Sequence, residues 1–122
     1  MKYEYYNPVD EKGGCVTRSI SKLLNKDYNQ VKNELIDLSK SLGYSDYREI
    51  EVFETYLKKY NVLEIPKEYN CKVKDLIIEP GKYIIFGNKD DWYHMVCLMD
   101  NTFYDKNERY QELNIIKIYK LK

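Results

Sequence analysis

Hydrophobic positions recur every three to four residues in the first half of the chain, which is the spacing of an amphipathic helix. This spacing predicts helices over residues 15–25, 27–42 and about 46–60. Asp27 is followed three residues later by Gln30, as in a capping box, and Gly43 is a typical helix stop. The sequence therefore predicts three helices before Pro66.

After Pro66 the hydrophobic pattern becomes typical of strands. Runs rich in β-branched and aromatic residues predict strands over residues 82–87, 93–99, 102–105 and 113–121. The segment Val73–Ile78 is too short to assign and is compatible with one helical turn. Residues 1–14 show neither period and are expected to be irregular. Helices followed by hairpin-connected strands predict an α+β fold, in which N-terminal helices pack on a C-terminal antiparallel sheet.

Composition narrows the class of protein. The chain has 122 residues, which suits a single domain over 1–122, and its 43% hydrophobic and 33% charged residues are typical of a folded, soluble protein. Twenty basic residues balance twenty acidic ones, so no nucleic-acid partner is expected. There is no apolar run of membrane-spanning length, and the polar, aromatic start predicts no signal peptide. We therefore expect a cytoplasmic protein without a membrane partner.

The cysteines and the histidine set the candidate chemistry. Three cysteines are an odd number for a disulfide framework, so reduced thiols are expected. The cysteines are not at the spacing of a zinc site and the chain has one histidine, so no metal or cofactor is expected. Cys15 follows Gly13-Gly14 at the predicted start of the first helix, where the helix dipole favours a thiolate. His94 lies far away on a predicted strand. The pair fits a nucleophile and its base, although a buried cysteine and a hydrogen-bonded strand histidine remain the alternative.

Strand register supplies a third group. A tight turn at Asp100-Asn101 places Met99 opposite Thr102 and puts Asp105 on the same strand face as His94. Asp105 is then a diagonal neighbour of His94, within reach of a side-chain hydrogen bond. Asn107, directly opposite His94, is the alternative third group. The register therefore predicts Cys15, His94 and Asp105 as a catalytic triad.

Packing of the first helix should complete the site. His94, Val96 and Leu98 share one strand face, and we expect the first helix to cover that face and so bring Cys15 toward His94. The other face, with Met95, Cys97 and Met99, should pack elsewhere. Two further residues stay open: Trp92 is expected either to line the cleft or to belong to the core, and Arg18 to be a surface residue or part of an ion pair.

The motifs resemble those of the papain-like cysteine peptidase superfamily, and most closely those of small, uncharacterised phage- and prophage-encoded members. The resemblance lies in two segments, Tyr5-Tyr6-Asn7-Pro8 with Gly14-Cys15-Val16-Thr17-Arg18-Ser19-Ile20-Ser21-Lys22, and His94-Met95-Val96 with Tyr104-Asp105. It implies a papain-like fold, a thiol hydrolase, and a bacterial host cytoplasm as the location.

The resemblance leaves the oxyanion hole open. Papain-like peptidases usually carry a glutamine a few residues before the cysteine, and the six residues before Cys15 contain none. Asn7, Tyr6 and the backbone N–H of Cys15 are the candidate donors.

Two functions of different class therefore follow. The first is a peptidase, isopeptidase or amidase that acts on a peptide or protein through a thioester, with acyl transfer to an amine as a weaker variant. The second is a catalytically inactive papain-like binding protein of phage origin that blocks a host or defence protein.

Overall fold

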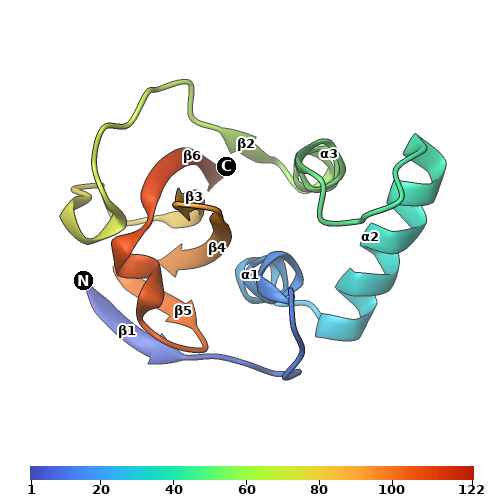
Figure 1. Cartoon of the computed structure of the whole chain (residues 1–122), viewed down its shortest axis with the longest axis horizontal. Coiled ribbons are helices and arrows are strands. Elements are labelled where there is room, and N and C mark those ends of the chain that lie inside the picture. The colour runs from blue at the N-terminus through green and yellow to red at the C-terminus, as the bar shows by residue number, and fades with distance from the viewer.

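The computed structural model describes every residue from Met1 to Lys122. Its elements are β1 (Lys2–Tyr5), α1 (Cys15–Leu24), α2 (Tyr28–Leu42), α3 (Ile50–Lys59), β2 (Val62–Glu64), the short 3-10 turn η1 (Val73–Asp75), β3 (Lys82–Lys89), β4 (Trp92–Met99), β5 (Thr102–Asp105), a second 3-10 turn η2 (Arg109–Glu112) and β6 (Asn114–Leu121). The protein is an α+β fold with three helices packed on a six-stranded mixed sheet (Figure 1).

The helices follow their local sequence signals. The Asp27 carboxylate accepts a hydrogen bond from the backbone N–H of Gln30 at 3.0 Å, which caps the start of α2 as predicted. Gly43 ends that helix in the left-handed conformation, with φ of 86°. The third helix begins at Ile50, later than expected, because the Asp46 carboxylate binds the backbone N–H of Arg48 and holds this segment in a turn.

The sheet has the strand order β1-β5-β4-β3-β6-β2. The four predicted strands, β3 to β6, pair antiparallel, which confirms that part of the prediction. Two edge strands were missed. Lys2–Tyr5 forms β1, which pairs parallel to β5, so the sheet is mixed and the N-terminal segment is not irregular throughout. The three-residue β2 pairs with β6. Both strands are too short to leave a periodic pattern, and their partners come from distant segments.

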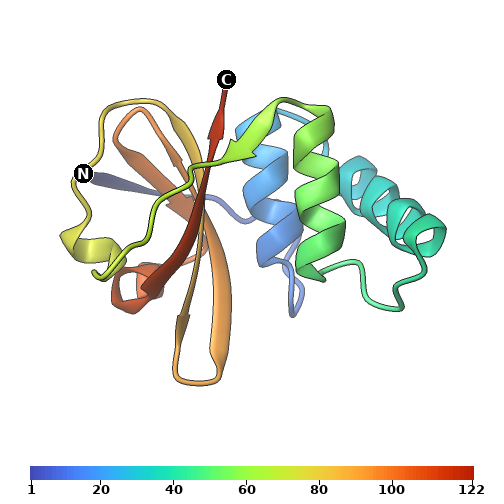
Figure 2. The ribbon, with the colours of Figure 1, turned by 90° about the horizontal axis from the view of Figure 1, so that it is seen from above.

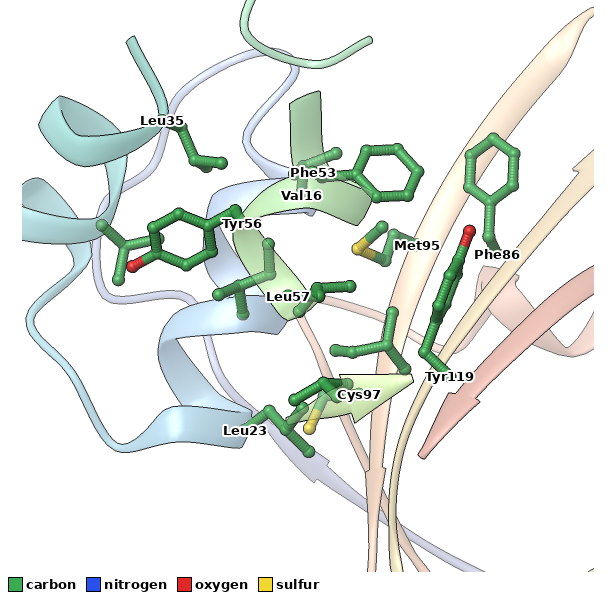
Figure 3. Packing of buried hydrophobic residues seen from close by; sticks show 14 of the residues in the cluster. Val16, Leu23, Leu35, Phe53, Tyr56, Leu57, Phe86, Met95, Cys97 and Tyr119 are labelled. Atoms are coloured by element: carbon green, nitrogen blue, oxygen red, sulfur yellow. The ribbon is translucent and has the colours of Figure 1, made fainter. Parts of the chain in front are cut away.

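All three helices lie on one side of the sheet (Figure 2). Helices α1 and α3 stand side by side next to the strands, and α2 lies outside them (Figure 2). A core cluster fills the space between the helices and the sheet, and Figure 3 shows its packing. Its fully buried members come from both layers and include Ile20, Val31, Leu35, Phe53, Leu57, Ile84, Met95 and Cys97. Each large apolar side chain buried in this way contributes roughly 1.5–3 kcal/mol to stability.

The structure corrects the prediction of which strand face α1 covers. The apolar stripe of α1 packs on the face of β4 that carries Met95 and Cys97. Val96 and Leu98 lie in a second core cluster on the opposite face, together with residues from η1 and η2. The prediction was wrong because β4 is buried on both faces, so that its side chains carry no polar alternation to identify the helix-covered side.

No helix of the protein is long and apolar enough to cross a membrane.

Candidate active site

Cys15 is the first residue of α1, and the two glycines before it allow close packing. Gly13 has φ of 70°, and a Cβ at this position would clash with the guanidinium of Arg48. A Cβ at Gly14 would lie 2.5 Å from the Tyr28 hydroxyl. No side chain caps the start of α1, so the first N–H groups and the positive end of the helix dipole are left for the Cys15 sulfur.

Helix α1 is attached to β4 at Met95, where the neighbouring strand ends. Met95 pairs with Phe86 of β3 on one side, but the ladder between β4 and β5 stops at the pair of Cys97 and Tyr104, which leaves the Met95 backbone without a strand partner on the β5 side. The Met95 N–H donates a hydrogen bond to the Cys15 thiol. The Met95 carbonyl accepts one from the Ser19 hydroxyl at 3.0 Å. Cys15 is therefore placed at a gap in the sheet, one residue from His94.

His94 and Asp105 form the predicted contact. The His94 Nε2 and Asp105 Oδ2 atoms are 2.6 Å apart, and both side chains are buried. The hairpin has the expected register, with Met99 opposite Thr102. Asn107, the alternative, accepts a hydrogen bond from the backbone N–H of Arg109 instead. Because Nε2 is occupied by Asp105, Nδ1 is the ring nitrogen left for the cysteine.

Two opposite pKa shifts couple Cys15 and His94. Burial raises the pKa of the Cys15 thiol. This effect is outweighed, and the pKa is lowered, by the hydrogen bond and charge of His94, the hydrogen bond from the Met95 N–H and the charge of Arg18. Burial lowers the pKa of His94, but the hydrogen bonds and charges of Asp105 and Cys15 raise it to about 9. Both shifts favour the thiolate and imidazolium forms of the pair, which is the reactive form of a cysteine nucleophile.

Arg18 belongs to the same group, a role that the sequence left open. Its side chain is only 2% exposed, and its Nη2 atom lies 3.1 Å from Asp105 Oδ1. The Asp105 carboxylate thus joins His94 on one oxygen and Arg18 on the other. The available sequence signal was the spacing of three residues from Cys15, which places both side chains on one helix face. A buried ion pair of this kind fixes the carboxylate in position.

The other two thiols differ from Cys15. All three cysteines are free. Cys97 is buried in the core under α1, and burial raises its pKa to about 12. Cys71 is partly buried against the second cluster. The thiols of Cys15 and Cys97 therefore have pKa values shifted in opposite directions.

Cys15 lines two cavities. One, of about 470 Å³, is lined by apolar residues such as Ile50 and Phe86 and by the Asp46–Glu49 segment. The other, of about 520 Å³, is lined by His94, Trp92, Asn107 and several basic residues. We call them the apolar arm and the basic arm of the cleft. Cys15 lines both arms, so an extended chain that occupied both would pass Cys15.

Trp92 fulfils both expectations. Its ring stacks on the His94 ring with centroids 4.8 Å apart, lines the basic arm, and also packs against the second core cluster.

The predicted oxyanion side chains are not brought to the cleft. The Asn7 amide donates to Asp10 at 3.3 Å, and Asn7 lines neither arm. The Tyr6 hydroxyl is hydrogen-bonded to Ser21, almost two turns along α1 from Cys15. The structure does not bring Asn7 to the cleft, because the segment before Cys15 folds back so that the Asn7 amide pairs with Asp10. The backbone N–H of Cys15 is the remaining candidate donor.

No group of His, Cys, Asp and Glu side chains is arranged to hold a metal ion. The sequence matches no protein-family model, and searches of curated proteins and of solved structures give no significant match. Interpretation of the site therefore depends on its own geometry.

Alkylation should single out Cys15. In the folded protein at pH 6, iodoacetamide is expected to modify Cys15 at least tenfold faster than Cys97, because a thiol with a lowered pKa has a larger thiolate fraction than a thiol whose pKa is raised to about 12. Mass spectrometry of the digested protein measures the sites. The same reaction in denaturant is the control, in which all three thiols should react alike. Preferential labelling of Cys71 in the folded state would contradict the assignment.

Proposed function

We propose that this protein is a papain-like thiol hydrolase that cleaves amide bonds in a peptide or protein, as a peptidase, isopeptidase or amidase. The observation that carries the proposal is the coupled Cys15–His94 pair, with a lowered thiol pKa, a histidine pKa of about 9, and Asp105 at 2.6 Å on the far side of the ring. The order of nucleophile, histidine and acid along the chain, with the nucleophile starting the first long helix, supports the papain-like assignment.

The proposed reaction uses each group in turn. The Cys15 thiolate attacks the carbonyl carbon and forms the S–C bond; as the C–N bond breaks, the His94 imidazolium gives its proton to the leaving nitrogen. Water then attacks the thioester, His94 takes a proton from it, and the C–S bond breaks to restore the thiolate. Asp105 holds the imidazole in the required tautomer throughout. The oxyanion is stabilised by the backbone N–H of Cys15 at the start of α1.

This mechanism sets the pH dependence. The attacking thiolate is lost on the acid side, below the lowered pKa of Cys15, and the protonated imidazole is lost as pH rises through about 9. Activity should therefore be highest between these two values.

A library of peptides from a digested proteome tests the function. After incubation at pH 7.5, mass spectrometry should find new peptide ends with the wild-type protein and none with Cys15→Ala. Acid quenching early in the reaction should trap an acyl group on Cys15 as a mass increase. A wild-type protein that produces neither new ends nor an acylated cysteine would overturn the proposal.

The second candidate is the inactive papain-like binding protein. The observation in its favour is the pairing of Asn7 with Asp10, which keeps the amide expected to serve as oxyanion donor out of the lining of the cleft. A reactive Cys15 that alkylates readily but never acylates on peptides would favour this function. The resemblance to small phage and prophage proteins supports a bacterial host cytoplasm for either function.

A further inference from the structure

The basic arm of the cleft carries an unbalanced positive charge. Lys12, Lys106 and Arg109 line it together with the buried Arg18, and no acidic residue lines it. Arg18 is neutralised by Asp105, whereas the other three cations lie beyond 4.0 Å of any carboxylate. A cavity with this lining attracts a negatively charged group.

The residues that build the site fix the guanidinium of Arg109 and the backbone of Lys106. The guanidinium of Arg109 lies 4.8 Å over the Trp92 ring, and that ring stacks on His94. The backbone N–H of Lys106 donates to the Asp105 carboxylate at 2.7 Å. The neighbouring Glu108 does not line the arm and binds the Gln111 amide. Residues 106–109 therefore present positive charge directly beside the catalytic histidine.

The apolar arm has a different character. Asp46 and Arg48 neutralise each other there at 3.0 Å, and the remaining charge comes from Glu49. The two arms are thus electrostatically unequal, and a substrate with one anionic end would bind in only one direction.

The position of His94 decides which end lies in the basic arm. His94 must give its proton to the leaving nitrogen, and it lines only the basic arm, whereas Cys15 lines both. The leaving part of the substrate therefore lies in the basic arm, and the acyl part in the apolar arm.

We propose, on the basis of the function proposed above, that the substrates are peptides with a carboxylate within two residues of the cleaved bond on the leaving side. Attack forms the S–C bond to Cys15, and the released amine takes the imidazolium proton and carries the carboxylate away. The carboxylate belongs either to an Asp or Glu side chain or to the free C-terminus of a short leaving peptide, since Lys106 and Arg109 bind the same group in both.

The test uses the best-cleaved peptide of the library, remade with Glu, Gln or Lys at each of the first two positions after the cleaved bond. At low salt, kcat/KM should be at least tenfold higher for Glu than for Gln at one position and lowest for Lys, and added salt should reduce the ratio. A second pair, shortened to two leaving residues with a free or amidated C-terminus, separates the terminal carboxylate from the side chain as the source.

Charge variants complete the test. In Lys106→Glu/Arg109→Glu the Glu-to-Gln ratio should fall below one and the Lys peptide should become the better substrate. Lys122→Glu is the matched control, because this exposed lysine is the C-terminal residue, at the opposite end of the sheet from the β3–β4 turn in Figure 2, and the ratio should stay at the wild-type value.

The possible failures can be told apart. Equal cleavage of the Glu and Gln peptides by the wild type would overturn the charge preference and leave the hydrolase proposal standing. An unchanged ratio in the double variant would likewise overturn it. Cleavage of no library peptide would overturn both proposals together.

Discussion

In Cys15→Ser, hydrolysis should fall by about 10⁴-fold or more, and the pKa of His94 should drop from about 9 toward its ordinary value. A serine hydroxyl stays neutral over the range in which His94 titrates, so His94 loses the negative charge of the thiolate that helps to hold its proton. Asp105 remains in place, so part of the upward shift should persist.

The chain offers an unusually clean measurement of this effect. His94 is the only histidine, so its ring C–H signals in a proton NMR titration need no assignment. Cys71→Ser is the control, since Cys71 lines neither arm of the cleft, and neither the pKa of His94 nor the activity should change. An identical His94 titration in wild type and Cys15→Ser would show that the two groups are not coupled.

Asp105→Asn should cost both activity and stability. Turnover should fall by roughly 10³–10⁴-fold, because the amide does not enforce the required imidazole tautomer. The free energy of unfolding should fall by about 3–5 kcal/mol, because Arg18 keeps its charge in a buried position without a partner. The ion pair with Arg18 thus adds a structural cost to the catalytic effect of this variant.

The double variant Arg18→Met/Asp105→Asn separates the two effects. Removal of the stranded charge should restore most of the lost stability, measured by denaturant unfolding, while turnover stays as low as in Asp105→Asn. Recovery of activity along with stability would mean that Asp105 serves only to anchor Arg18. Arg18→Met alone leaves the contact of Asp105 with His94 intact, so its loss of turnover should be the smaller one.

Local signals were sufficient for the elements that their own residues specify. Asp27 caps α2 and Gly43 ends it, as expected. Asp100 and Asn101 both adopt positive φ, 50° and 67°, as a two-residue hairpin turn requires. That turn fixed the register of β4 and β5, and the register placed Asp105 within reach of His94.

The sequence predicted that Cys15 approaches His94, but it assigned α1 to the wrong face of β4. Cys15 was expected to approach His94 because α1 would cover the face of Val96 and Leu98. The helix covers the opposite face and reaches His94 at the end of β5, where the Met95 backbone is free to bind Cys15 and Ser19. The choice of Cys15, His94 and Asp105 did not depend on which face of β4 is covered by α1, whereas the residues that surround them did.

The sequence by itself determined the helix caps, the hairpin register and the set of Cys15, His94 and Asp105, because each depends on short-range geometry or on a residue type that the chain offers once. Only the tertiary structure decided the burial of Arg18 beside Asp105, the parallel pairing of β1 with β5, and the unequal arms of the cleft. These features join segments up to a hundred residues apart. Burial and charge pairing between distant helices and strands stabilise these features, and the local propensity of a segment does not indicate which distant segment it will contact.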